Sequence, residues 1–141
     1  VKEIRNSMKS KHPVKFIETK KVYREWGTES ILTDSSLYLG KINFYKAGFA
    51  GGLQKHKEKD ETFHIISGEG YLDLEIITGK LQRFTIKTGD TIHIPPGAVH
   101  RIKAITDLTG VEFSNSIEND RHRCEEEYGE PKDETGLQST W

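Results

Sequence analysis

Four side chains with metal-binding chemistry lie in two separated segments of the chain. Gln54 and His56 are two residues apart, and alternate residues of an extended strand share a face, so these two side chains point the same way. The charged segment Lys57–Asp60 predicts a turn that reverses the chain and brings Glu61 alongside them. Further along, a proline-rich turn is followed by a strand that carries His100 at its start. We therefore expect these four side chains to converge in one cavity.

An amide oxygen, a carboxylate and two neutral imidazoles would form a mixed nitrogen and oxygen site. Such a set predicts one divalent metal ion, with Zn²⁺ favoured and Fe²⁺, Mn²⁺, Ni²⁺ and Co²⁺ as alternatives. Three or four protein ligands leave coordination positions open, which is typical of catalysis or ligand binding rather than of a purely structural ion. The alternative is a cavity whose polar residues only hydrogen-bond to one another.

The elements that must position these residues are short strands. Between Lys20 and Ser116, runs of β-branched and aromatic residues are broken by Gly, Pro and Asp, and helical periodicity is absent. This pattern predicts an all-β protein, an antiparallel sandwich or barrel. The expected strands are Lys21–Trp26, Leu37–Lys46, Thr62–Ser67, Tyr71–Ile77, Leu81–Ile86, Thr91–Ile94, Val99–Ile105 and Gly110–Ser114.

The rest of the chain is expected to flank this barrel. One short helix is predicted near Glu118–Tyr128, ending at Gly129. We therefore divide the chain into an N-terminal arm (residues 1–19), a barrel domain with its C-terminal helix (residues 20–130) and a tail (residues 131–141).

The composition limits the classes of partner and the cell compartment that we expect. The 141 residues carry a formal net charge of -1, which removes the main electrostatic argument for a nucleic-acid partner. No apolar run is long enough to cross a bilayer, and a single cysteine, Cys124, favours a reducing compartment, so we expect a cytoplasmic protein. An apolar Trp141 near the end of the tail suggests that a second subunit holds the arms, and a homodimer is the hypothesis.

Two motifs resemble those of the cupin superfamily. The spacings Glu61-x6-Gly68 and Gly89-x5-Pro95-x-Gly97-x2-His100 are intact. The resemblance implies an all-β cupin fold, a double-stranded β-helix or jelly-roll barrel, with a metal on His56, Glu61 and His100. The departure is Gln54-x-His56 in place of the usual His-x-His.

That departure is similar to the pattern of the type II mannose-6-phosphate isomerase family, in which a Leu-Gln-x-His segment contributes to the metal site. The likeness extends from Arg24-Glu-Trp26-Gly27 through Ile94-Pro-Pro-Gly97-Ala-Val-His100-Arg101 to the acidic element that ends in Tyr128-Gly129. It implies aldose–ketose isomerisation of a sugar phosphate. The pair Gly51-Gly52 replaces the family's Leu-Ser and indicates a wider pocket, so another sugar derivative stays open as the substrate.

Five further residues are candidates for the substrate side of the site. Glu112 is a general base if its side chain points inward. Arg101 could reach over the rim to a phosphate or carboxylate, although by alternation it leaves the cavity face. Lys41 aligns with a family lysine that could contact substrate, against the alternative of a solvated strand lysine. Asp120 and Arg123 match family positions, with an ion pair securing the C-terminal element as the alternative.

Two other functions stay open because one fold hosts many activities. A metal-dependent oxygenase would use Fe²⁺, consume oxygen and act on an acid that is not a sugar. A binding module would hold a sugar or nucleotide sugar without turnover. The isomerase is the leading hypothesis.

Overall fold

The computed structural model describes residues 9, 11–117 and 120–128, so the predicted tail at 131–141 lies outside the described residues. Within them, short antiparallel strands form two sheets, and the predicted all-β fold is confirmed. No helix in these ranges is long and apolar enough to cross a bilayer.

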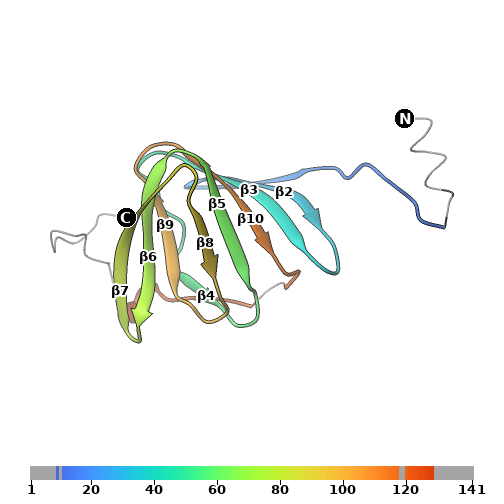
Figure 1. The fold of residues 1–141 in the computed structure, drawn as a ribbon. Helices are drawn as coiled ribbons and strands as arrows, with labels where there is room; N and C mark the ends of the chain where they lie inside the picture. Colours follow the sequence, from blue (N-terminus) through green and yellow to red (C-terminus); the bar gives the residue numbers. More distant parts are fainter. Residues whose placement is uncertain (1–8, 10, 118–119, 129–141) are drawn as a thin grey trace.

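The two sheets pack face to face as a flattened barrel (Figure 1). One sheet has six strands in the order β1-β2-β3-β10-β5-β8, and the other has five in the order β11-β4-β9-β6-β7. The strands are β1 (Lys20–Arg24), β2 (Gly27–Asp34), β3 (Leu39–Tyr45), β4 (Gln54–His56), β5 (Glu61–Ser67), β6 (Glu69–Ile77), β7 (Lys80–Lys87), β8 (Thr91–Ile94), β9 (His100–Ala104), β10 (Leu108–Ser114) and β11 (Arg121–Arg123).

The inward-facing residues of the strands form both the hydrophobic core and the polar candidate site. Along β5, Glu61, Phe63 and Ile65 are all buried and face the interior, because alternate residues of a strand share a face. Phe63 and Ile65 belong to the main hydrophobic cluster, while Glu61 lies at the end of the strand where the interior becomes polar. Trp26 stacks on Tyr45 with ring centroids 4.3 Å apart and packs against this cluster.

The first hairpin differs from the prediction. The strand expected over Lys21–Trp26 ends at Arg24, and a second strand, β2, begins at Gly27 and pairs with both β1 and β3. The sequence of β2 is GTESILTD, which lacks clean alternation of apolar and polar residues. Its strand conformation comes from pairing on both sides, so sequence pattern alone missed it.

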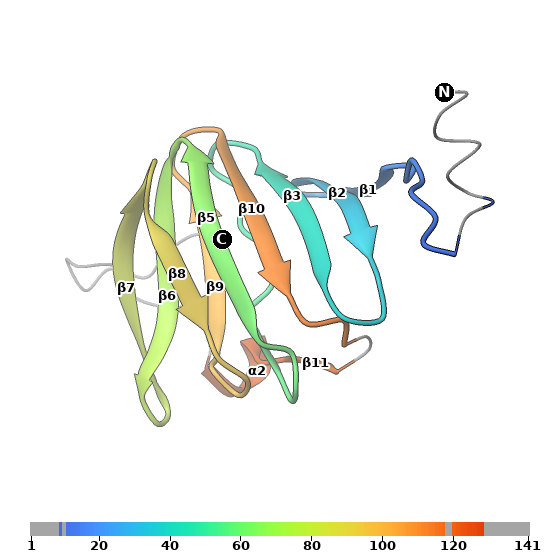
Figure 2. The same cartoon turned by 45° about the vertical axis from the view of Figure 1, so that its right-hand side comes forward.

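The C-terminal helix is shorter than predicted. A helix is present only at α2 (Glu125–Tyr128), and the preceding residues Arg121–Arg123 form strand β11 against β4. Figure 2 shows β11 and α2 together at the lower end of the barrel. Cys124, between them, is fully buried in a small cluster with Leu53 and Val99. Pairing with β4 and burial of Cys124 therefore outweigh local helix propensity.

Candidate metal centre

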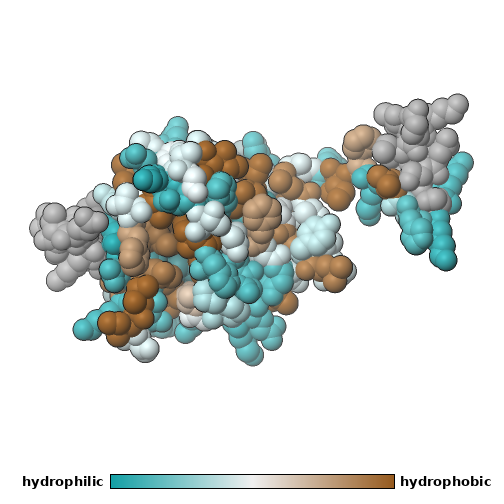
Figure 3. Space-filling view, in the orientation of Figure 1, coloured by the Kyte–Doolittle hydropathy of each residue, from teal (hydrophilic) through white to brown (hydrophobic). Residues whose placement is uncertain are grey.

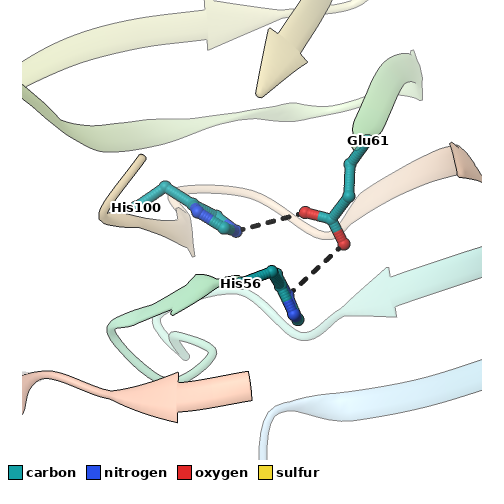
Figure 4. A group of neighbouring side chains, drawn as sticks. All are labelled: His56, Glu61 and His100. Carbon is teal, nitrogen blue, oxygen red and sulfur yellow. Dashed lines mark ion pairs between the residues drawn. The ribbon is translucent and has the colours of Figure 1, made fainter. Parts of the chain in front are cut away.

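Three side chains from three strands meet at one end of the barrel interior: His56 from β4, Glu61 from β5 and His100 from β9. Figure 4 shows the Glu61 carboxylate pointing between the two imidazoles. His100 Nε2 lies 3.4 Å from Glu61 Oε2, and His56 Nε2 lies 3.6 Å from Glu61 Oε1. All three side chains are buried. The two distant segments therefore converge as predicted.

Both imidazoles are oriented through their outer ring nitrogens. His56 Nδ1 lies 3.0 Å from Asp120 Oδ1, and His100 Nδ1 lies 3.0 Å from the backbone oxygen of Ala98. Such acceptors place the proton on Nδ1 and leave Nε2 as a free ligand atom. His56 Nε2 is buried and has no hydrogen-bond partner. A buried ring nitrogen that lacks a partner is a natural metal ligand.

The spacing of these atoms fits an ion. One ligand atom from each of the three residues lies within 4.8 Å of the others. Two atoms at about 2.1 Å from one ion, with a tetrahedral angle between them, would be about 3.4 Å apart. The 3.4 Å separation to Glu61 Oε2 and the 3.6 Å separation to Glu61 Oε1 are close to that value, so each imidazole pairs with a different oxygen of the carboxylate. Two histidines and a carboxylate thus suit a divalent cation, and three ligands leave positions open.

Gln54 lies beside this group. It is paired in register with His100, shares its strand face with His56 and lines the cavity. Three of the four predicted ligands, Gln54, Glu61 and His100, thus line the cavity, and His56 lies beside Glu61. Whether the amide oxygen of Gln54 completes the coordination stays a prediction.

A buried lysine adjoins the centre. Lys59 Nζ lies 3.2 Å from Glu61 Oε1 and 3.2 Å from Glu112 Oε2. Burial alone would lower the pKa of Lys59, but the charges of Glu112 and Glu61 outweigh it and raise that pKa. For Glu61, burial alone would raise the pKa, but in the absence of an ion protonated His100, Lys59 and protonated His56 outweigh it and lower that pKa to about 2. A bound ion would take the place of the Nε2 protons of the two imidazoles. Glu61 is therefore ionised and Lys59 is protonated.

Glu112 faces the cavity, as its predicted role as a base requires. It is buried on β10 and lines the same cavity as Glu61 and His100. Lys41 Nζ lies 3.6 Å from Glu112 Oε2 and 2.7 Å from Glu29 Oε1, and Glu29 also pairs with Arg24 at 2.8 Å. The predicted substrate lysine is therefore part of a chain of ion pairs across the cavity wall.

Arg101 projects from the opposite face of β9. Its neighbours His100 and Ile102 point to the interior, whereas its Nε lies 3.5 Å from Asp73 Oδ2, and Asp73 is fully buried. Arg83 donates to the same carboxylate at 2.8 and 3.0 Å. Arg101 contributes to the cavity lining, yet its guanidinium lies near this carboxylate.

Two residues around the centre have roles that the sequence did not indicate. Lys59 lies in the predicted turn, where no alternation rule says which way a side chain points. Asp120 matched a family position, with an ion pair that secures the C-terminal element as the alternative; in the structure it contacts His56 and accepts backbone hydrogen bonds from Glu58 at 2.8 Å and Lys59 at 2.9 Å. It therefore ties the β4–β5 turn to a metal-centre imidazole.

A second group of potential ligands lies at β11 and α2. His122, Cys124 and Glu127 have ligand atoms within 4.8 Å of one another. His122 and Glu127 are exposed and pair at 2.6 Å, whereas burial raises the pKa of the Cys124 thiol. Metals bind the thiolate, so this group is less suited to an ion than the centre at Glu61.

The metal centre opens into a cavity of about 630 Å³, a size suited to a small organic ligand. Its lining is rich in charged side chains, and Trp26, Tyr45 and Phe63 supply apolar surface. A compact ligand with several oxygen atoms fits such a lining.

Comparison with known proteins identifies the family. A model of the cupin domain matches residues 42–113, just over half of the 141 residues. The chain is a cupin. The match spans β4, β5 and β9, so all three candidate metal ligands of this cupin lie within the matched domain.

Two curated proteins resemble part of this cupin. An uncharacterized protein of Methanocaldococcus jannaschii, MJ1618, is 38% identical over 53 residues, which is 38% of each chain. Acireductone dioxygenase of Schizosaccharomyces pombe is 34% identical over 56 residues, 39% of this chain and 32% of that protein. The matched segments span only about a third of these relatives' lengths.

Solved structures share the cupin's fold. The capsular polysaccharide assembling protein CapF from Staphylococcus aureus superposes with a TM-score of 0.68 at 18% identity, over 76% of this chain and 32% of that one. KdgF from Halomonas superposes with a TM-score of 0.61 at 15% identity, over 74% of this chain and 92% of that one. At these identities the likeness concerns the fold.

Proposed function

We propose that this cupin is a metal-dependent isomerase that moves a proton between adjacent carbons of a small sugar, with a sugar phosphate as the substrate class. One observation carries the proposal: Glu61 and His100, which group with His56, line the same cavity as a second buried carboxylate, Glu112. The sequence likeness to type II mannose-6-phosphate isomerase supports the same reaction.

The reaction needs polarised substrate oxygens and a proton carrier. A divalent ion bound by the triad, with Gln54 as a fourth ligand, would supply Lewis-acid polarisation of the hydroxyl and carbonyl oxygens. Glu112 would accept the proton from one carbon and return it to the next. Lys59, 3.2 Å from the Glu112 carboxylate, would orient that carboxylate.

Zn²⁺ is our first candidate for the ion. The ligand set combines imidazole nitrogen with carboxylate and amide oxygen, which suits Zn²⁺ and also Fe²⁺, Mn²⁺, Ni²⁺ and Co²⁺. Elemental analysis of the purified protein identifies the ion directly.

A metal-dependent oxygenase is the second candidate. Two histidines and one carboxylate with open positions are the ligand set of many non-haem Fe²⁺ oxygenases, and one partial relative is a dioxygenase. This function predicts bound iron and oxygen consumption, and it assigns no proton-carrying role to Glu112.

The decisive experiment combines elemental analysis with a panel of sugar-phosphate isomerase assays on wild type and His100→Ala. Wild type should hold about one ion per chain and interconvert an aldose and a ketose phosphate, and His100→Ala should lose both properties. His93→Ala is the matched control, since His93 is exposed and pairs with Asp60 instead. A wild type that binds metal but isomerises nothing contradicts the isomerase and favours the oxygenase or a non-catalytic sugar-binding cupin.

The Glu112→Gln variant distinguishes loss of the general base from loss of the metal ion. We expect kcat to fall by about 10²- to 10⁴-fold with the metal content unchanged, because general-base catalysis contributes that much. Glu127→Gln, at an exposed pair with His122, is the control. Unchanged kcat in Glu112→Gln would exclude Glu112 as the proton carrier.

We propose further that the protein forms a homodimer through the outer face of the six-stranded sheet. Apolar side chains are exposed there and on the arm that leaves β1 towards the N-terminus (Figure 3). On the sheet these are Tyr23, Ile66 and Phe113, and on the arm they are Val14, Phe16 and Ile17. Light scattering should give twice the chain mass, and Phe113→Glu should reduce it. A clean monomer for the wild type would contradict the dimer.

A cytoplasmic location is part of the same proposal. Cys124 is a free thiol, fully buried beside Leu53 and Val99. A lone cysteine that packs as a small apolar side chain suits a reducing compartment. Cell fractionation tests the location.

A further inference from the structure

Strand β11 presents two arginines to the cavity. Arg121 is paired in register with His56, and Arg123 with Gln54. Register partners on neighbouring strands project from the same face of a sheet, so both arginines lie on the side of the metal centre. Both contribute to the cavity lining, whereas His122 between them pairs with Glu127 on the other side.

The two arginines differ in their partners. Arg123 Nη2 donates to Glu125 Oε1 at 2.9 Å, and this pair lies against Gly52, where an added Cβ would come within 3.2 Å of the guanidinium. Arg121 makes no side-chain hydrogen bond or ion pair within the described ranges. Its side chain is exposed at the cavity mouth.

The other charges around the cavity are largely compensated. Arg24 and Lys41 pair with Glu29, and Lys59 pairs with Glu61 and Glu112. Among the described residues, Arg121 is thus a cation without a partner on the wall that carries the candidate metal ligands. A guanidinium presents parallel N–H donors that match a carboxylate or a phosphate in a bidentate way.

We propose that Arg121 binds the anionic group, a carboxylate or phosphate, of the ligand whose oxygens meet the metal centre. Because Arg121 and His56 are cross-strand neighbours, with Cα atoms about 5 Å apart, the anionic group and the metal-binding oxygens belong to one compact molecule. The inference deepens the proposed function, since it assigns the residue that recognises the charge of the substrate. It requires no particular sugar.

The test compares three ligands with one carbon skeleton. Glycerol is neutral, glycerate adds a carboxylate and glycerol 3-phosphate adds a phosphate. Each is titrated by calorimetry into the metal-free protein, in which only protein groups can recognise the anion, and then into protein loaded with Mn²⁺. We expect wild type to bind at least one of the two anions about tenfold or more tightly than glycerol in both forms. The anion that binds more tightly shows whether the site recognises a carboxylate or a phosphate.

Arg121→Gln should lose that preference, with a fall of about 10- to 100-fold in affinity for the preferred anion and no change for glycerol. Lys55→Gln is the matched control, because Lys55 is paired in register with His122 on the same two strands and faces away from the cavity. It removes the same charge and should leave the preference intact.

Two outcomes overturn the inference: wild type that binds neither anion more tightly than glycerol, or Arg121→Gln that keeps the full preference. Equal losses in Arg121→Gln and Lys55→Gln also overturn it, since they would indicate general electrostatic attraction. The isomerase assays report on the proposed function separately. Loss of the preference in Arg121→Gln with no isomerase activity would uphold the anion site and reject the reaction.

Discussion

Among the individual residues, the orientation of two imidazole rings shapes the candidate metal centre. His56 and His100 each use Nδ1 for an oxygen outside the centre and direct Nε2 towards Glu61. For His100 that oxygen is a backbone carbonyl, but for His56 it is the Asp120 side chain. The His56 orientation can therefore be changed without touching a ligand.

Asp120→Asn is expected to weaken metal affinity about 10- to 100-fold, because the carboxylate no longer fixes the tautomer and orientation of His56. Competition titration with a chelating indicator measures the affinity. Asp60→Asn is the control, since Asp60 pairs with the exposed His93. If both variants bind metal like the wild type, Asp120 does not orient a ligand.

At the scale of the strands and their connections, backbone contacts determine where the site residues lie. The β5–β6 connection turns at Gly68, whose φ of +96° is unfavourable for other residues. A Cβ at this position would lie 2.1 Å from the Asp107 backbone oxygen. The connection therefore needs glycine both for its φ angle and for the close approach of β10.

Gly68→Ala should lower the free energy of unfolding by more than Gly79→Ala. Gly79 also has a positive φ, +83°, but no atom lies within 4 Å of an added Cβ. Gly79→Ala should thus cost only the conformational penalty, about 1–2 kcal/mol, and Gly68→Ala roughly 1–3 kcal/mol more for the clash. Urea unfolding measures both. Equal losses would show that β10 adjusts freely.

The ion pairs across β1, β2 and β3 should make stability depend on pH. Burial alone would raise the pKa of Glu29, but Lys41 and Arg24 outweigh it and hold that pKa below its ordinary value of 4.5. A lowered pKa in the folded state means that the stabilisation is complete above about pH 4.5 and is lost as the pH falls through the lowered pKa.

Glu29→Gln should therefore be less stable than wild type by about 1.5–3 kcal/mol at pH 7, the usual contribution of hydrogen bonds to charged groups. The difference should shrink as the pH is lowered below 4.5. Thermal unfolding at several pH values checks it, and a difference that stays constant down to pH 3 would contradict the ion-pair explanation.

At the scale of the whole molecule, the metal centre joins parts of the barrel that are distant in the sequence. Its residues come from β4, β5 and β9, and Asp120 adds the segment before β11. An ion that binds only the folded arrangement stabilises all of these contacts together.

Removal of the ion should lower Tm by several degrees. At an ion concentration about 100 times Kd the expected stabilisation is about 2.7 kcal/mol. Differential scanning calorimetry before and after chelation measures it, and restoring the ion should restore Tm. His100→Ala should show no shift on adding metal, and a shift as large as that of the wild type would place the ion elsewhere.

The class of fold and the grouping of the candidate ligands could be predicted from the sequence alone. Strand alternation put Gln54 and His56 on one face, and a short polar turn placed Glu61 near them, since these relations are local in the chain. The hairpins that carry β5 to β8 also follow from local turn signals. Strand β2 and the limits of the C-terminal helix could not be predicted in this way, because pairing and burial override their local patterns.

The surroundings of the candidate ligands could not be predicted without the packed fold. The Lys59–Glu112 ion pair, the Asp120–His56 contact and the register pairing of Arg121 with His56 all join residues that are far apart in the sequence. Their positions depend on how β11 and β10 return to β4 and β5. Local periodicity specifies which face of a strand a residue occupies, whereas its partner across the barrel depends on the packing of the two sheets.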